Sequence, residues 1–503
     1  MMKRLLFTLS LLVLVFSNPS FAQAADEIKE DKPVYKPVYN NTDPVCNCED
    51  LLKVEIPDTK IQSARLNSIN NSCQVTAIVN HPPFEDRVTV TITLPMKDWN
   101  GRFLGFGGAG FVGGLPFFIY GPEASKGFAT GYSDGGHPGG SAAFAYNEKE
   151  DRLDWQSIRD FSHVAVHDMT ATGKALVKAL YGKPARYSYF AGLSNGGRQA
   201  MEEVQRYPED YDGVIANCPA IYWNHFLIGY LWPQAVMNEM NNFLPGEKLI
   251  AVTDAVIASC DGDDGLVDSV IDDPFNCKWD PKEFVGTKVG ESVFTETDAD
   301  VVRKIWEGPR GYDGRYLWDG LTRGSYLCDY AITKGDPVVG VPDAGVVDWV
   351  KYFLLQDPSW DGKSITCSEF EMLFIQAVDQ YASLYETSNT DLSPFRDHGG
   401  KLIMTHGLAD NMIPPQGTIK YYKLLQEKMG GTKATSKFAR LFLFPGVDHL
   451  FKGPGVKPVD PFGALMKWVE EGKAPEYLDA ELKDEAGEVL RREAIYPYGK
   501  NNK

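Results

Sequence analysis

The sequence lacks the surplus of basic residues that nucleic-acid binding requires, and its N-terminal apolar run is too short to cross a membrane. Lysine and arginine number 50 against 68 acidic residues, which gives a formal net charge of −18. An acidic surface repels phosphate backbones and anionic lipid headgroups, so we expect neither nucleic acid nor membrane as a partner. The apolar run covers only residues 5–16.

Cys-x-x-Cys pairs, internal repeats and low-complexity runs are absent as well. The absence of paired cysteines argues against a zinc site of the finger type. His163 and His167 stand four residues apart on a helix-like segment, residues 158–180, but no third ligand of suitable spacing is near them. We therefore interpret both histidines as structural.

The N-terminus has the three parts of an export signal. Basic residues lie within residues 1–4, the apolar run follows, and the small-residue site Ala22-Gln23-Ala24 comes next. We expect residues 1–24 to be a signal peptide, residues 25–45 to be a flexible segment, and the mature protein to be secreted or periplasmic.

Export also affects the interpretation of the eight cysteines. In an oxidising compartment, cysteines are more often structural bridges than reactive thiols. Cys73 is expected to pair with Cys46 or with Cys48.

A strand-like segment, residues 187–193, runs into the motif Gly192-Leu193-Ser194-Asn195-Gly196 and then into a helix-like segment. The glycines allow a turn so sharp that the serine hydroxyl stands exposed on a strained backbone. The following helix N-terminus favours developing negative charge. Ser194 is therefore the candidate nucleophile, although an isolated motif of this kind is also compatible with an ordinary helix N-cap.

Two further strand-like segments end in the residues that a serine nucleophile needs. Residues 399–410 end in Asp410, and residues 440–449 end in His449. The chain order Ser, Asp, His is that of α/β-hydrolases, whose triad residues follow the carboxyl ends of parallel strands. We predict that His449 is the general base for Ser194 and that Asp410 orients the imidazole.

Plainer interpretations exist for the acid and the base. Asp410 could begin a turn ahead of Pro414 and Pro415, and the acid could instead be Asp448 or Asp397. The histidine could be an ordinary loop residue that is hydrogen-bonded to backbone. Three strand-end positions in the right order favour the catalytic interpretation.

Backbone N–H groups must also stabilise the oxyanion of the tetrahedral intermediate. Asn195, directly after the nucleophile, offers one donor, and the glycine-rich segment 102–110 offers a second from Gly108 or Ala109. This segment also has the Gly-x-Gly-x-x-Gly spacing of a dinucleotide site. Because further glycines and a proline follow where that site has a helix, we discount a dinucleotide.

The chain resembles the tannase and feruloyl esterase family over residues 46–475. The resemblance is carried by Ala-Gly-Leu-Ser-Asn-Gly-Gly-Arg-Gln at 191–199, Arg-Tyr-Pro-Glu-Asp-Tyr-Asp-Gly at 206–213, Pro-Ala-Ile at 219–221, His-Gly-Leu-Ala-Asp at 406–410, Ile-Pro-Pro at 413–415, Pro-Gly-Val-Asp-His at 445–449 and Gly-Pro-Gly at 453–455. It implies an α/β-hydrolase core formed by residues 46–223 and 394–503. A lid, residues 224–393, is expected between the serine and the acid.

The resemblance also implies the activity, which is hydrolysis of small-molecule esters with aromatic, phenolic acyl groups. The lid is rich in aromatic residues that could floor an acyl pocket, although most lid aromatics are expected to form the lid's own core. Two alternatives remain. One is a general carboxylesterase without aromatic preference, and the other is a non-catalytic protein that binds phenolics or sugars.

An acidic segment, residues 260–277, is the second candidate site. Carboxylates that converge in an ordered loop repel one another unless a hard cation lies between them, whereas those of a solvated loop need none. The spacing is not that of an EF-hand, because the required glycine falls on Leu266. The resemblance implies a structural calcium ion and a Cys260–Cys277 disulfide. The implied ligands are the carboxylates of Asp261, Asp264 and Asp268 and the carbonyls of Leu266 and Val270.

One departure from the family concerns the catalytic loops. The family usually has a disulfide between cysteines immediately before the serine and after the histidine, and here those positions are Leu193 and Leu450. We expect the two leucines to be buried against each other with Cα atoms within about 7 Å. Truncating either to alanine would then cost about 2–5 kcal/mol.

Overall fold

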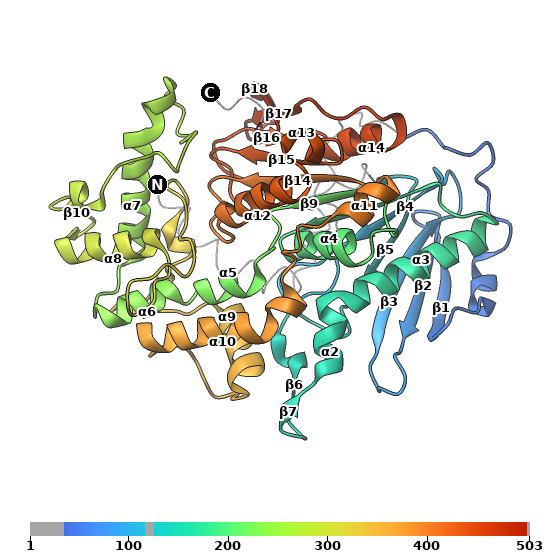
Figure 1. The fold of residues 1–503 in the computed structure, drawn as a ribbon, viewed down its shortest axis with the longest axis horizontal. Helices are drawn as coiled ribbons and strands as arrows, with labels where there is room; N and C mark the ends of the chain where they lie inside the picture. Colours follow the sequence, from blue (N-terminus) through green and yellow to red (C-terminus); the bar gives the residue numbers. More distant parts are fainter. Residues whose placement is uncertain (1–34, 116–124, 500–503) are drawn as a thin grey trace.

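A nine-stranded mixed sheet forms the centre of the molecule, with the strand order β1-β2-β3-β5-β4-β8-β9-β14-β15 (Figure 1). The structure is a computed structural model that describes residues 35–115 and 125–499. The predicted signal peptide, residues 1–24, lies outside the described residues. The same is true of residues 25–34 of the predicted flexible segment 25–45.

The strands from β1 to β5 pair antiparallel, and those from β5 to β15 in the sheet order pair parallel. The strands are β1 (Thr59–Asn67), β2 (Ser72–Val79), β3 (Val88–Pro95), β4 (Arg102–Phe106), β5 (Ala129–Ser133), β8 (Tyr187–Leu193), β9 (Gly213–Asn217), β14 (Lys401–Gly407) and β15 (Ala439–Phe444).

The burial of each strand follows its place in the sheet. Strand β3 alternates, with Val88, Val90, Ile92 and Leu94 buried and the residues between them partly exposed. Strand β9 is buried at every position, as expected for a parallel strand covered on both faces. The candidate catalytic segments follow buried parallel strands, so the sheet brings their carboxyl ends to one edge.

Helices cover the two faces of the sheet and form two hydrophobic clusters. Helices α3 (Ala165–Tyr181), α4 (Asn195–Arg206) and α12 (Pro415–Lys428) pack on the face that carries Phe190 and Met404. Helix α14 (Pro461–Glu471) packs on the other face, which carries Tyr189 and Ile403. Adjacent residues of one strand thus belong to opposite clusters, as the period of a strand requires.

Outside the segment between β9 and β14, the remaining elements are short helices and strands that connect the strands and helices named above or follow them in the chain. They are η2 (Cys48–Lys53), η4 (Ala142–Ala145), β6 (Tyr146–Asn147), β7 (Arg152–Leu153), α2 (Trp155–Arg159), the π-helical turn η5 (Asp160–Val164), α11 (Ser393–His398), α13 (Thr432–Thr435), β16 (Lys457–Pro458), β17 (Leu478–Lys483) and β18 (Val489–Ile495). Strands β16, β17 and β18 form a separate antiparallel sheet.

The segment between β9 and β14 gathers to one side of the sheet, in green to orange in Figure 1. It contains α5 (Trp223–Gly229), α6 (Trp232–Glu239), α7 (Gly246–Cys260), η6 (Asp261–Asp264), η7 (Pro281–Phe284), β10 (Lys288–Val289), β11 (Ser292–Val293), α8 (Glu296–Glu307), η8 (Leu327–Asp329), β12 (Thr333–Lys334), β13 (Val339–Gly340), α9 (Ala344–Trp349), the π-helical turn η9 (Val350–Leu355) and α10 (Cys367–Tyr385). This segment includes the predicted lid, residues 224–393, and the boundaries of the lid stay a prediction.

Most lid aromatics form the interior of the lid. The buried ones are Phe226, Tyr230, Trp232, Trp279, Phe294, Trp306, Trp318, Tyr330, Trp349, Phe353, Phe370, Phe374, Tyr381 and Tyr385, and partly buried ones include Tyr326, Tyr352 and Trp360. Tyr312 and Tyr316 are 96% and 51% exposed. Most of the aromatic residues thus serve packing, and only a few remain available to contact a ligand.

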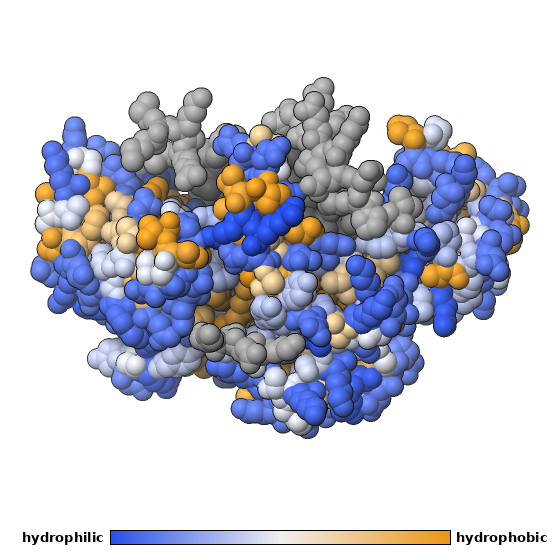
Figure 2. Space-filling model, turned by 90° about the horizontal axis from the view of Figure 1, so that it is seen from above, coloured by the Kyte–Doolittle hydropathy of each residue, from blue (hydrophilic) through white to orange (hydrophobic). Residues whose placement is uncertain are grey.

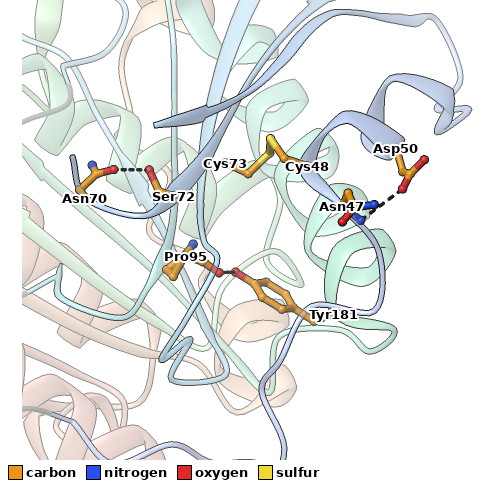
Figure 3. Close-up of a disulfide and its surroundings, with 8 residues drawn as sticks. All are labelled: Asn47, Cys48, Asp50, Asn70, Ser72, Cys73, Pro95 and Tyr181. Atoms are coloured by element: carbon orange, nitrogen blue, oxygen red, sulfur yellow. Dashed lines mark hydrogen bonds between the residues drawn. A yellow bond between two sulfur atoms is a disulfide. The ribbon is translucent and has the colours of Figure 1, made fainter. Parts of the chain in front are cut away.

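Two disulfides are formed. Cys48 of η2 pairs with Cys73 of β2, with Cα atoms 5.4 Å apart, which decides between the two candidates for Cys73 (Figure 3). Cys260 pairs with Cys277, with Cα atoms 5.8 Å apart. The interpretation of the cysteines as bridges is wrong for the four that are free, Cys46, Cys218, Cys328 and Cys367. Cys218 is fully buried, where a free cysteine packs as a small hydrophobic residue.

Figure 2 shows a face that is largely hydrophilic, with hydrophobic residues in small scattered groups. Most of the large apolar side chains lie instead in the two buried hydrophobic clusters on the faces of the central sheet. Within residues 35–115 and 125–499, no helix has both the length and the apolar character of a membrane span.

Candidate active site

Ser194 connects β8 to α4 with a strained backbone. Its φ and ψ are 64° and −123°, a conformation that costs a non-glycine residue about 1–3 kcal/mol. A Cβ on Gly192 would lie 2.0 Å from the Gly196 carbonyl oxygen, and one on Gly196 would lie 2.8 Å from that of Gly108. These glycines therefore permit the tight turn. Ser194 remains partly exposed, as a nucleophile must be.

Backbone hydrogen bonds hold this turn in place. The Ser194 N–H donates to the carbonyl of Asn217 at 3.0 Å, and the Ser194 carbonyl accepts from the N–H of Arg198 at 3.0 Å and of Ala220 at 3.3 Å. The serine is thus fixed between the end of β9 and the first turn of α4. Such external support is what allows a strained conformation to persist.

His449 and Asp410 form a buried hydrogen-bonded pair. The distance from His449 Nδ1 to Asp410 Oδ2 is 2.8 Å, and the residues are 2% and 0% exposed. Burial alone would lower the pKa of His449, but the charge of Asp410 and its hydrogen bond raise it above the ordinary value. This arrangement leaves Nε2 as the nitrogen that can exchange a proton with a substrate or a nucleophile.

Asp410 is held as a carboxylate by several donors. Its Oδ1 accepts from the backbone N–H groups of Met412 and Ile413, both at 2.8 Å, and His406 Nε2 lies 3.1 Å from Oδ2. Although burial raises the pKa of Asp410, His449 and His406 hold it well below the ordinary range. A carboxylate that stays ionised beside an imidazole favours the imidazolium that forms during proton transfer.

The two alternative acids have other partners. The carboxylate of Asp448 accepts from the backbone N–H groups of Leu450 at 2.9 Å and Lys452 at 2.7 Å. Asp397 is exposed and pairs with Arg396 at 2.8 Å. Among the three aspartates that the sequence offered, Asp410 is the one hydrogen-bonded to His449.

Both candidates for the second oxyanion donor already have hydrogen-bond partners. The Gly108 N–H donates to Gln199 Oε1 at 2.8 Å, and the Ala109 N–H donates to the Val112 carbonyl at 3.2 Å. Ala109 has the longer bond to exchange for a substrate oxygen, and the oxyanion assignment stays a prediction. Asn195 stands at the first position of α4, where the N–H has no intrahelical acceptor.

Arg198 and Gln199 are functional neighbours that the sequence analysis left without a role. Gln199 Nε2 donates to the Gly113 carbonyl at 2.8 Å, so this side chain bonds both ends of the glycine turn. Arg198 is fully buried and donates from Nε to Asn195 Oδ1 at 2.9 Å. Their place directly after the elbow motif is the signal that could have found them.

His163 and His167 have structural partners, as predicted. His163 Nδ1 lies 2.7 Å from the Tyr207 hydroxyl, and His167 Nδ1 lies 2.6 Å from Asp210 Oδ2. The His167 ring also stacks on Tyr207 with centroids 4.0 Å apart. His163 thus fastens η5, and His167 fastens α3, to the segment after α4.

The inserted segment contacts the loop that carries Asp410. Ser325 Oγ donates to the Asp410 carbonyl at 3.2 Å, and Asn411 Nδ2 donates to Asp329 Oδ2 at 2.7 Å. Thr322 Oγ1 donates to the Leu408 carbonyl at 2.5 Å. The lid is therefore joined to the acid loop directly, and it helps to fix the position of the carboxylate.

The leucines that replace the family's cysteine pair do not form the buried contact that we expected. Leu450 is 45% exposed, and Leu193 is only partly buried. The reason is the turn after His449, in which the Leu450 N–H donates to Asp448 Oδ1 at 2.9 Å and the Phe451 N–H donates to the Asp448 carbonyl at 3.1 Å. This turn leaves Leu450 at the surface.

We accordingly revise the expected cost of truncating Leu450. Leu450→Ala should change the free energy of unfolding by less than about 1 kcal/mol, because the side chain is largely hydrated already. The control is Leu441→Ala in β15, which is fully buried and should cost about 2–5 kcal/mol. Urea denaturation measures both, and equal costs would contradict the exposure of Leu450.

The acidic loop folds around Asp261. Asp261 Oδ1 accepts from the N–H groups of Asp268 at 2.9 Å and Val270 at 3.3 Å, and Oδ2 accepts from Ser269 at 3.0 Å. Asp264 Oδ1 accepts from the Leu266 N–H at 2.8 Å. The predicted calcium ligands are thus gathered in one loop that the Cys260–Cys277 disulfide closes.

The donor chemistry of this loop fits a hard cation, because every predicted ligand atom is oxygen. Burial and the neighbouring Asp264 and Glu493 carboxylates raise the pKa of Asp272 to about 6, so negative charge is crowded here. Asp268 also pairs with Arg491, which would compete with an ion. In the described part of the chain, the sets of three His, Cys, Asp or Glu side chains whose possible metal-binding atoms lie within 4.8 Å of one another are outside this loop. The calcium ion stays a prediction.

Comparisons with known proteins identify the family of the chain. Residues 73–503 match the family described as "Tannase and feruloyl esterase". A "Probable feruloyl esterase" of Arthroderma benhamiae is 38% identical over 448 residues, covering 86% of this chain and 83% of its own. Feruloyl esterase C of Talaromyces stipitatus is 29% identical over 506 residues, covering 96% and 92%.

Solved structures share the fold. A tannin acyl hydrolase from Aspergillus niger superposes with a TM-score of 0.77 at 24% identity, covering 88% of this chain and 89% of its own. An esterase from Aspergillus oryzae superposes with a TM-score of 0.78 at 24% identity, covering 90% and 96%. The predicted α/β-hydrolase fold is thereby confirmed, and the chain belongs to the tannase and feruloyl esterase family.

Proposed function

We propose that this protein is a secreted or periplasmic serine esterase that hydrolyses esters of aromatic, phenolic acids. The observation that carries the proposal is the hydrogen bond between His449 and Asp410. Both residues follow parallel strands of the central sheet, at the same edge as the strained turn of Ser194. The feruloyl esterase relatives support the substrate class. The two disulfides agree with an oxidising compartment.

In the proposed reaction, the Ser194 hydroxyl attacks the ester carbonyl carbon while His449 takes its proton. The tetrahedral intermediate collapses, His449 returns the proton to the leaving alcohol, and the acyl group remains on the serine. Water then attacks the acyl carbon while His449 takes its proton. The second intermediate collapses, the bond to the Ser194 oxygen breaks, His449 returns the proton to that oxygen, and the acid is released. Asp410 keeps the imidazole in the tautomer that presents Nε2 and stabilises the transient imidazolium.

The oxyanion of each intermediate needs preorganised donors. We assign one to the backbone N–H of Asn195, at the positive end of α4. The Ala109 N–H is the candidate second donor, and it would have to exchange its bond to Val112 for one to the substrate. Gln199, which bonds the glycine turn at Gly108 and Gly113, limits how far this turn can move.

A crevice beside the acid loop has an aromatic lining, and it must widen to admit an acyl ring because its volume is only about 10 Å³. It is lined by Tyr222, Phe226 and Trp318 together with Ile413 and Pro414, which follow Asp410 in the chain. Tyr222 and Trp318 have ring centroids 5.2 Å apart, so an aromatic acyl ring would meet aromatic faces and edges. We infer that this crevice contributes to acyl recognition.

The substrate class is tested with methyl esters that share one leaving group. Methyl ferulate, methyl gallate and a monomethyl terephthalate are compared with methyl butyrate as the aliphatic control. We expect kcat/KM for at least one aromatic ester to exceed that for the control by about tenfold or more. Equal values would favour a general carboxylesterase, and binding without any turnover would favour a non-catalytic phenolic-binding or sugar-binding protein.

The activity should depend on pH through His449. The imidazole must be neutral to accept a proton, and Asp410 raises its pKa above the ordinary value of 6.5. The kcat/KM should therefore rise with pH and reach half its plateau above pH 6.5. In Asp410→Asn the residual activity should have its acid limb at lower pH, because the charge that raises the pKa of His449 is gone. An unshifted limb in the variant would contradict this assignment.

A calcium ion, if bound by Asp261, Asp264 and Asp268 and the carbonyls of Leu266 and Val270, would neutralise the acidic loop and stabilise the folded lid. Chelation should lower Tm by about 3 °C or more, while turnover at low temperature changes less. Re-addition of Ca²⁺ should restore Tm in the wild type but not in Asp264→Asn. A melting curve indifferent to chelator, with no calcium detected afterwards, would remove calcium from the account.

A further inference from the structure

A cluster of titratable side chains outside the Ser194 site joins the β2–β3 connection to the helical segment after α2. His81 and Asp86 lie between β2 and β3, Asp160 begins the π-helical turn η5, and Asp168 lies in α3. The side chains of Asp160 and Asp86 are 1% and 3% exposed, and that of Asp168 is 13% exposed. The cluster is thus a largely buried group of three carboxyls around one imidazole.

Both nitrogens of the His81 ring face carboxylate oxygens. Nδ1 lies 2.5 Å from Asp86 Oδ2 and 3.8 Å from Asp160 Oδ1, and Nε2 lies 3.2 Å from Asp168 Oδ2. A neutral imidazole carries only one N–H, so one lone pair would face a carboxylate. The contact is favourable only if the ring is protonated, one of the carboxyls is protonated, or a cation lies between these groups.

The cluster is also short of hydrogen-bond donors. Asp86 Oδ1 accepts from the His81 backbone N–H at 2.9 Å, and Asp160 Oδ1 accepts from Gln156 Nε2 at 2.7 Å. Asp160 Oδ2 is buried with no hydrogen-bond partner among the described residues. Asp168 Oδ2 is likewise buried without a hydrogen-bond partner among these residues, and an unpaired buried oxygen is costly.

Positive charge other than His81 is missing from these contacts. Within the described residues, no lysine or arginine forms an ion pair with Asp86, Asp160 or Asp168. A bound cation would relieve this crowding of negative charge without requiring protons.

We propose that His81 Nδ1, Asp86 and Asp160 bind one divalent cation of the zinc type, with solvent as a further ligand. The ligand atoms of these three residues lie within 4.8 Å of one another, and two ligands of a tetrahedral zinc ion are about 3.3 Å apart. The 2.5 Å contact between His81 and Asp86 therefore has to open by less than about 1 Å.

The imidazole favours zinc over calcium or magnesium, which prefer sites made of oxygen alone. Asp168 has a different role, because it lies at the other ring nitrogen. Its Oδ2 lies 3.2 Å from Nε2, and with a metal on Nδ1 it would accept the Nε2–H and fix that tautomer. The site would stiffen η5, where the Phe161 and Ser162 carbonyls accept from Arg198 at 3.2 Å and 2.7 Å, next to Asn195.

The test is titration of the chelator-treated mature protein with ZnCl2 by calorimetry. The wild type should bind one equivalent that His81→Asn and Asp160→Asn bind at least about a hundredfold more weakly. Asp168→Asn should weaken binding by about ten- to a hundredfold, because it disturbs only the ring orientation. With CoCl2 as a second probe, the wild type should show visible absorption bands that His81→Asn lacks.

Two variants serve as matched controls. Asp264→Asn in the acidic loop and His449→Asn at the candidate active site should keep the equivalent of Zn²⁺ and the cobalt bands. This inference does not depend on the proposed esterase activity, since its readouts are binding and absorption. Zn²⁺ binding that is equal in the wild type and in all three cluster variants, or no stoichiometric binding by the wild type, would overturn it.

Discussion

Replacing Ser194 by alanine is expected to lower kcat for ester hydrolysis by at least about a thousandfold while the protein stays folded. The hydroxyl is the proposed nucleophile, and no acyl-enzyme can form without it, although oxyanion and binding contributions remain. The change should not destabilise the fold, because the strained turn is held by backbone bonds to Asn217, Arg198 and Ala220 that alanine can also make. Steady-state kinetics and a melting curve measure both effects.

His449→Ala should cause a loss of similar size, and combining it with Ser194→Ala should add little, because the two residues act as a unit. Ser436→Ala is a matched control, since its hydroxyl is exposed and contacts only the Lys433 carbonyl. The Ser436 residue as a whole is partly exposed, and its one hydroxyl bond among the described residues is weak at 3.3 Å, so this control should keep full activity. Near-normal turnover in either catalytic variant would end the esterase assignment.

The second large effect is expected for Asp410→Asn, with a loss of about ten-thousandfold in kcat. Asp410 Oδ1 accepts two backbone N–H groups and Oδ2 accepts from His449, so both sides of the carboxylate are acceptors. The side-chain NH2 group of an asparagine must face either the two backbone N–H groups or the His449 N–H, and all of these are donors. If it faces His449, the imidazole takes the wrong tautomer, and Nε2 then carries the proton that it should accept.

Two neighbouring aspartates make this prediction specific. Asp397→Asn removes an exposed carboxylate and should be neutral for kcat. Asp448→Asn should disturb the turn after His449 through its bonds to Leu450 and Lys452, and it should lose much less activity than Asp410→Asn. If Asp448→Asn were the more damaging change, the acid would have been assigned to the wrong residue.

The sequence predicted the parts of the site that depend on strand ends. Ser194, Asp410 and His449 each follow an apolar segment that became a buried parallel strand, and the pairing of β8, β9, β14 and β15 places these ends along one edge. The hydrophobic pattern fixes such strands, because burial on both faces requires apolar residues throughout. The fold class and the order of the triad candidates followed from this pattern.

Features set by turn geometry could not be predicted in this way. The Gly108 N–H bonds Gln199, a residue 91 positions away, and the turn after His449 leaves Leu450 exposed. The first contact has no local sequence signature. The second depends on a local aspartate turn, but the apolar pattern around His449 does not show that this turn exposes Leu450. The choice of Cys48 for Cys73 likewise depends on how η2 lies against β2, as Figure 3 shows.

The cluster around His81 was missed for a similar reason. His81 and Asp86 are five positions apart, but Asp160 and Asp168 lie far along the chain on another element. Only the packing of η5 and α3 beside the β2–β3 connection brings them together. A search of the sequence for metal-ligand spacing examines near neighbours and therefore does not find such a site.

The claim that Ser194 is the nucleophile of an acyl-transfer reaction is tested most directly by covalent labelling with an active-site phosphonate, followed by mass spectrometry of the peptides. We predict a single adduct on Ser194 in the wild type, a much slower reaction in His449→Ala, and no adduct in Ser194→Ala. A wild-type protein that remains unlabelled, or a Ser194→Ala variant that is still labelled at the same rate, would contradict the account.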